Sequence, residues 1–184
     1  DGLGGAARLV KQGDGILLLP KAEFTHTGET NVWGGTLAFD GAMEQSPLWL
    51  NRHTCLRSDG GRFMSVKADY GATIEVGDDA EGAAQITAGT LALGFGARLV
   101  VDLYAESLTA DRVEVATLKV ERKSGAAWEQ AGPDYLAPVI ELVGHPAEGE
   151  TRMAPGRYVI GHVEHLEGKV EELIVEGITT SKKN

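Results

Sequence analysis

The chain has 184 residues, of which 25 are glycine and 6 are proline, and its formal net charge is −10 at pH 7. That charge argues against nucleic acid and anionic membrane surfaces as partners, and no apolar run approaches the roughly 18 residues of a membrane-spanning helix. The single cysteine, Cys55, excludes an internal disulfide framework and any zinc site that needs two thiolates. The sequence starts at Asp1 without a methionine, so we expect a leader or a larger upstream region in the parent protein.

Short apolar runs follow one another along the chain, and each ends at Gly, Asp, Asn or Pro. Many alternate apolar and polar residues, as Thr73-Ile74-Glu75-Val76 does, and this period of two predicts half-buried strands. No window of about a dozen residues has convincing helical periodicity. The sequence therefore predicts an all-β protein, with strands at 16–19, 36–39, 48–50, 63–66, 73–76, 91–93, 98–103, 112–115, 117–120, 139–143, 157–160 and 173–175.

Several of these strands are similar in sequence. The segment 35–39 (GTLAF) recurs as 89–93 (GTLAL), and segments 72–76, 97–101 and 116–120 share a small-x-apolar-x-Val pattern. The last three begin 25 and 19 residues apart, which is the length of one coil of a β-solenoid, whereas a β-sandwich predicts no repeat at this spacing. We therefore expect a parallel β-solenoid whose interior holds Leu37, Ile74, Leu91, Leu99 and Leu118.

The N-terminal segment also resembles a known family. Residues 9–19 (LVKQGDGILLL) and 27–37 (TGETNVWGGTL) are similar to the autotransporter-associated β-strand repeat, although Trp33 stands where that family has a small polar residue. The resemblance covers residues 7–41 closely and 41–103 loosely. It implies a right-handed parallel β-helix within a large, secreted bacterial surface protein. Similar repeats also accompany some secreted polysaccharide-degrading proteins.

The C-terminal third differs in composition. Three short segments, Gly132-Pro133-Asp134, His145-Pro146 and Ala154-Pro155-Gly156, hold three of the six prolines, and a Glu-Gly-Glu segment lies between the last two, which indicates dense turns. We therefore divide the chain into solenoid coils over 1–120 and a less regular β region or cap over 121–184, continuous with the first part.

Candidate catalytic groups are few. Cys55 is expected to be a small core residue, and a nucleophilic pair with His53 has no identifiable orienting acid. The acids that a β-helix enzyme could use do not form a recognisable pair, and we expect them to be solvated separately along outward strand positions. They are Asp69, Glu75, Asp102, Glu114 and Glu121.

Candidate metal ligands occur in two places. His162 and His165 are three residues apart, and Asp78, Asp79 and Glu81 form an acidic turn. Zinc would need the two imidazoles on one face, and calcium would need more oxygen ligands than this turn supplies. We therefore expect solvated histidines, a plain acidic turn, and neither a bound metal nor a cofactor.

Aromatic side chains are the candidate ligand-binding groups. A ring face can pack against the C–H face of a sugar, and Trp33, Trp49, Tyr70 and Trp128 are the residues considered for this role. Trp33 and Trp49 are selected because each neighbours a residue expected to face inward, so that the indole faces outward. Packing against a partner domain would explain the same rings.

These observations predict a non-enzymatic stalk, spacer or adhesive surface within a secreted or cell-surface bacterial protein. Its expected partners are other domains of the same polypeptide. The alternative is a carbohydrate-binding accessory module of a polysaccharide-degrading protein, in which Trp33 and Trp49 contact the glycan. A polysaccharide lyase or hydrolase comes third.

Overall fold

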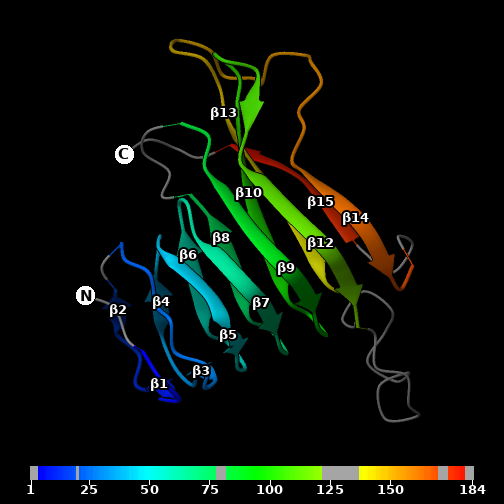
Figure 1. Cartoon of the computed structure of the whole chain (residues 1–184). Coiled ribbons are helices and arrows are strands. Elements are labelled where there is room, and N and C mark those ends of the chain that lie inside the picture. The colour runs from blue at the N-terminus through cyan, green and yellow to red at the C-terminus, as the bar shows by residue number, and fades with distance from the viewer. Residues whose placement is uncertain (1–3, 20, 78–81, 122–136, 170–173, 181–184) are drawn as a thin grey trace.

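The computed structural model describes residues 4–19, 21–77, 82–121, 137–169 and 174–180. Two parallel sheets face each other, and the chain passes from one to the other in every coil (Figure 1). Sheet A contains, in order, β1 (Leu9–Lys11), β3 (Thr30–Val32), β5 (Ala42–Leu50), β7 (Arg62–Ala68), β9 (Gln85–Leu93), β12 (Arg112–Val120) and β14 (Gly161–Glu167). Sheet B contains β2 (Ile16–Leu18), β4 (Thr36–Ala38), β6 (Cys55–Ser58), β8 (Thr73–Val76), β10 (Arg98–Tyr104), β13 (Val139–His145) and β15 (Ile174–Thr180).

The strand register gives the length of each coil. The residues aligned along sheet B are Ile16, Thr36, Cys55, Thr73, Arg98, Val139 and Ile174. Their separations are 20, 19, 18 and 25 residues, and then 41 and 35. Helices are absent from the part of the chain that the structure describes. The predicted all-β parallel solenoid is therefore confirmed, with compact coils first and longer coils after β10.

Five leucine and isoleucine residues were predicted to lie in the interior of the solenoid. Leu37, Ile74, Leu91 and Leu99 are buried in one continuous core, and Leu118 is partly buried against it. Alternation along each strand directs these side chains inward, because every second residue of a strand lies on the same face. Burial of such side chains stabilises the fold by about 1.5–3 kcal/mol each.

Two of the predicted alignments are wrong. Leu37 lies in sheet B and Leu91 in sheet A, so segments 35–39 and 89–93 are not equivalent positions. Leu118 is aligned with Leu91, and Leu99 with Ile140, so the 19-residue spacing is not a coil. The physical reason is that strands of both sheets bury alternate residues and end at turns, so their sequence patterns look alike.

The longer strands of sheet A bend in the middle. Phe63 and Val66 both face the core, although they are three residues apart, because Met64 and Ser65 both lie outside. The register skips the pair Met64 and Gly89, where a side chain on Gly89 would meet the carbonyl oxygen of Met64 at 2.7 Å. This bend gives each coil an extra corner, as in a β-helix.

The C-terminal coils are less regular, as predicted. The strands β12 to β15 continue both ladders, but the register shifts between Glu141 and Val143, and a long loop joins β13 to β14. A short strand, β11 (Thr109–Ala110), pairs antiparallel with β10. The division of the chain at residue 120 stays a prediction.

Lys11 and Gly35 give the N-terminal repeat its physical basis. Lys11 is only 7% exposed, and its ammonium donates to the carbonyl oxygens of Gln12, Gly13 and Gly34 at 3.2, 2.6 and 2.7 Å. These bonds join the turn of the first coil to the turn of the second. Gly35 has φ +65°, and a Cβ there would overlap the carbonyl oxygen of Gly15.

We therefore predict that Gly35→Ala destabilises the protein by a few kcal/mol, because it combines a strained φ with a backbone clash. The matched control is Gly15→Ala, since Gly15 has no neighbouring atom within 4 Å of an added Cβ. Urea denaturation followed by circular dichroism measures both. Equal loss of stability in the two variants would contradict the turn assignment.

Candidate functional site

Trp33 and Trp49 are both exposed side chains of the N-terminal coils. Trp33 follows β3 and is 57% exposed, while Trp49 lies in β5 and is 38% exposed. In the ladder Asn31 is aligned with Trp49, and Trp33 is two residues beyond Asn31. Trp33, just past the end of β3, and Trp49, on β5, therefore come from neighbouring coils.

A cation lies beside the second indole. Lys67, aligned with Trp49 on β7, places its ammonium 5.3 Å from the centre of the Trp49 ring. The same ammonium is 3.6 Å from a carboxylate oxygen of Glu121, so its charge is partly compensated. The surface around Trp49 thus combines a planar apolar ring with a positioned lysine, which are the kinds of group that contact sugars.

The remaining aromatic candidates have different positions. Tyr70 is half-buried and stacks on Phe95, with ring centres 4.9 Å apart and planes 17° apart. His53 packs against the edge of Tyr70 at 5.4 Å. The sequence interpretation did not include Phe95 in this group, and Trp128 lies outside the described residues.

Four of the acids selected from the sequence have partners of their own. Glu75, Glu114 and Glu121 each pair with a cation, namely Arg57, Arg112 and Lys67 at 2.9, 2.7 and 3.6 Å. The carboxylate of Asp69 accepts a bond from the backbone N–H of Tyr70. These acids therefore form ion pairs or a turn hydrogen bond at the surface of the stack. Each exposed ion pair contributes at most about 1 kcal/mol to the free energy of unfolding.

Two other aspartates correct the expectation that the acids are separately solvated. Asp102 and Asp111 are 2% and 0% exposed, and the Nε2–H of His145 donates to a carboxylate oxygen of Asp102 at 3.0 Å. One oxygen of Asp111 accepts the N–H of Ala84 at 2.7 Å, and the other accepts the N–H of Asp102 at 3.0 Å. The sequence interpretation missed Asp111 and its link to Asp102 and His145.

Burial raises the pKa of Asp111 to about 6, with the nearby Asp102 charge adding to the shift and the two backbone N–H bonds opposing it. A pKa in this range is typical of catalytic acids. Asp111 is nevertheless fully buried, and both of its oxygens are bonded to the main chain. Its role is to fasten β10, β11 and the segment before β9 together.

Cys55 is not a core residue, contrary to the expectation. It lies on the outer side of β6, half-buried, while the neighbouring Leu56 enters the core. Burial raises the pKa of the Cys55 thiol to about 12, with Glu75 adding to the shift, so the thiolate is disfavoured at neutral pH. His53 belongs to a turn with φ +56° and contacts Tyr70, so it does not share a strand with Cys55, at which β6 begins.

The candidate metal ligands remain apart or outside the described residues. His162 and His165 are exposed on β14 and are aligned with Glu114 and Thr117. The acidic turn with Asp78, Asp79 and Glu81 lies outside the described residues. Where the chain is described, no three His, Cys, Asp or Glu side chains are placed to hold a metal ion, and no helix is long and apolar enough to cross a membrane.

Comparison with known families gives one match. Residues 9–39 match the passenger-associated-transport repeat, which confirms the resemblance to the autotransporter-associated repeat. This is a structural repeat of the passenger regions of autotransporter-type proteins, and such regions are secreted or lie on the outer surface. No curated protein and no solved structure matches the chain. The matched segment contains Lys11, Gly13 and Gly35, whose contacts join the first two turns.

Asp111 makes stability depend on pH in a defined direction. Its pKa in the folded protein, about 6, is above the ordinary value near 3.9, so the folded state keeps a proton that the unfolded state has lost. The contribution of Asp111 is therefore fully present below pH 4 and falls by about 1 kcal/mol per pH unit up to pH 6. Urea denaturation of wild type and Asp111→Asn from pH 4 to 7 should show this difference. A difference independent of pH, or the same trend in the exposed control Asp14→Asn, would contradict it.

Proposed function

We propose that this chain is a rigid, non-enzymatic spacer in a secreted or surface-exposed bacterial protein of the autotransporter passenger type. The proposal rests chiefly on the two parallel ladders, which share one core that apolar side chains from Leu17 to Ile160 form or contact. Each strand of such a stack bonds to the coil before and the coil after it, so bending the stack would break main-chain hydrogen bonds. A body of this kind holds another domain at a fixed distance from the cell.

Ion pairs between successive coils support the same role. Arg57 on β6 pairs with Glu75 on β8, and Arg98 on β10 pairs with Glu141 and Glu176 on β13 and β15. The distances are 2.9, 2.6 and 3.2 Å. These pairs run along the stack rather than within one coil, so they oppose the separation of neighbouring coils.

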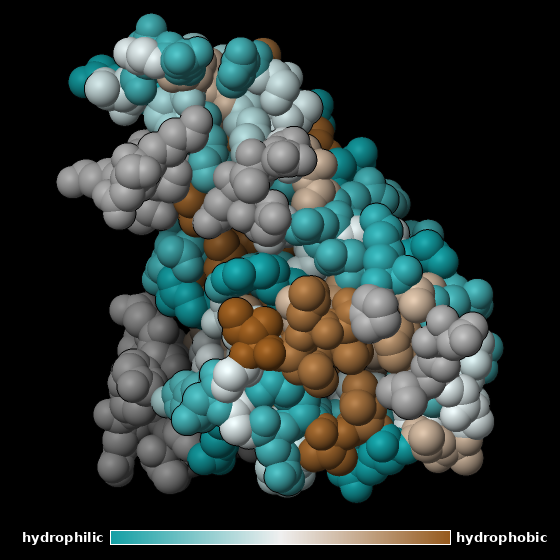
Figure 2. Space-filling model, turned by 90° about the vertical axis from the view of Figure 1, so that its left-hand side faces the viewer, coloured by the Kyte–Doolittle hydropathy of each residue, from teal (hydrophilic) through white to brown (hydrophobic). Residues whose placement is uncertain are grey.

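The N-terminal end of the stack supports the proposal of a partner domain in the same polypeptide. Figure 2 is viewed from the side of Figure 1 where β1 and β2 lie, and apolar side chains gather over this end. Ile16 and Leu18 of β2 are 66% and 73% exposed, and Leu17 is only partly buried. An apolar end with strand edges on it is suited to contact a further domain that covers it.

Rigidity can be measured by fluorescence energy transfer between the two ends. The dyes are placed by Asp14→Cys and Glu167→Cys in a Cys55→Ser background, since both sites are exposed and lie in the first and last coils. We expect one narrow distance distribution that persists in urea up to a single cooperative transition. Broadening of the distribution before the transition would contradict a rigid spacer.

A second function is favoured by the positions of Trp33 and Trp49. We propose that these two indoles contact a carbohydrate chain, because both are exposed on neighbouring coils and Lys67 lies beside the second. A flat array of rings can stack on successive sugar rings without a deep pocket. This contact would add an adhesive surface to the spacer.

A glycan array tests this contact. Trp33→Ala and Trp49→Ala should each weaken binding about three- to tenfold, as the loss of one aromatic contact predicts. Met64→Ala is the matched control, because Met64 is apolar and 46% exposed on the same sheet. An equal loss in all three variants, or binding by none of the proteins including wild type, would contradict the contact.

A further inference from the structure

Three successive turns between the sheets have the same geometry. They span residues 51–54, 69–72 and 94–97, and in each the N–H of the fourth residue donates to the carbonyl of the first, at 3.3, 2.9 and 3.0 Å. The third residue is left-handed in every case, with φ values of +56° at His53, +64° at Gly71 and +63° at Gly96. Hydrogen bonds also join consecutive turns, from His53 to Tyr70 and from Gly71 to Phe95. The three turns therefore form one rigid stack.

The second residues of these turns make a column of side chains. They are Arg52, Tyr70 and Phe95, in the order of the stack. Phe95 is 5% exposed and lies under Tyr70 at 4.9 Å, and the guanidinium of Arg52 lies 5.7 Å from the centre of the Tyr70 ring. The aromatic rings thus support an exposed guanidinium at the end of the column.

Arg52 differs from the cations of the strands. The arginines and lysines of β6, β7, β10 and β12 each have a carboxylate within 4.0 Å. Among the residues that the structure describes, no carboxylate lies within 4.0 Å of the Arg52 guanidinium. The guanidinium contacts the ring of Tyr70 instead. Its N–H donors therefore remain available for an acidic group from outside the chain.

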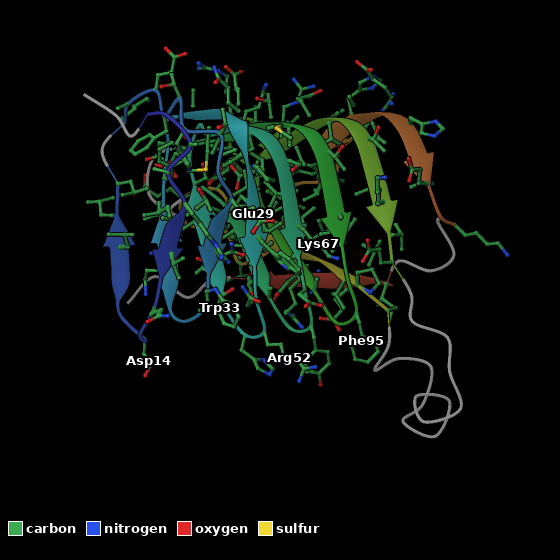
Figure 3. All side chains as sticks on the ribbon, turned by 60° about the horizontal axis from the view of Figure 1, so that its bottom comes forward. Asp14, Glu29, Trp33, Arg52, Lys67 and Phe95 are labelled. Carbon is green, nitrogen blue, oxygen red and sulfur yellow. The ribbon has the colours of Figure 1, made fainter. Side chains whose placement is uncertain are left out.

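Trp33 lies on the turn next to Arg52. The N–H of Asn51, which precedes Arg52, donates to the carbonyl of Val32, which precedes Trp33, at 3.0 Å. The side-chain amide of Asn51 donates to the same carbonyl at 3.0 Å. Figure 3 shows Asp14, Trp33, Arg52 and Phe95 along one edge of the stack, whereas Glu29 and Lys67 lie over the strands. Neighbouring coils are about 4.8 Å apart, so the indole and the guanidinium are within reach of one ligand.

We propose that Trp33 and Arg52 form a subsite for a chain of acidic sugars such as uronates. The indole packs against the C–H face of one sugar ring, and the guanidinium forms paired hydrogen bonds with the carboxylate of a neighbouring sugar. This assignment rests on the carbohydrate contact proposed above and names its ligand class. The net charge of −10 opposes an anionic ligand at long range, but screening confines that effect to about 10 Å at 0.1 M salt.

Calorimetric titration with oligogalacturonate and with its methyl ester tests the subsite on the whole chain. The ester keeps the sugar backbone and removes the charge. We expect Arg52→Gln to weaken binding of oligogalacturonate about tenfold, and the ester to bind wild type as weakly as the acid binds Arg52→Gln. The matched control is Arg57→Gln, which removes the same charge from an exposed arginine that is paired with Glu75. It should leave the affinity unchanged, and thermal melting verifies that each variant is folded.

Three results would overturn the proposal. If wild type bound oligogalacturonate and its methyl ester with equal affinity, the carbohydrate contact would be retained, but the proposed selectivity for acidic sugars would be wrong. An equal loss in Arg52→Gln and Arg57→Gln would show a general charge effect instead of a subsite. If wild type bound neither oligogalacturonate nor mannuronate oligomers, the subsite would be overturned. The glycan array would then decide separately, from the binding of neutral glycans, whether the carbohydrate contact exists.

Discussion

The whole structure depends on how closely the main chain approaches itself at the turns. Stacked strands are about 4.8 Å apart, so each turn must pass at that distance from the turn of the next coil. At Gly28, Gly35 and Gly41 an added Cβ would overlap a carbonyl oxygen of the preceding coil. Lys11 then satisfies the carbonyl groups that converge where the first two turns meet. The lysine and glycines of the repeat are therefore one solution to crowding of the backbone.

Fixed turns place equivalent residues of successive coils in columns. Inward columns join apolar side chains such as Leu37, Leu56 and Ile74, and outward columns join opposite charges such as Arg57 and Glu75. Each exposed pair alone contributes little, but the common register lets one coil add to the next without new geometry. A stack of this kind lengthens by repetition, which suits a spacer.

The glycines and the period of two predicted the strands, and the repeat spacing together with the family resemblance predicted a solenoid and the five inward positions. They could not assign strands to sheets, because strands of both sheets obey the same pattern, and Leu118 was therefore aligned with the wrong partner. The sequence also could not reveal the buried cluster of Asp102, Asp111 and His145. Its members are separated by 9 and 43 residues. Asp111 meets Asp102 because β11 folds back on β10, and His145 meets Asp102 because β13 lies beside β10 in sheet B.

His53 shows how the turn stack and the proposed ligand surface are related. A left-handed conformation costs a residue other than glycine about 1 kcal/mol, and the two following turns use Gly71 and Gly96 at the same position. The imidazole offsets that cost by packing on Tyr70, the ring that also supports Arg52. The strain at His53 and the position of the Arg52 guanidinium therefore depend on one aromatic ring. Loss of the Tyr70 ring would free both residues while leaving the main-chain turn bond of Asn51 and Thr54 intact, so the edge could lose its binding surface without losing its fold.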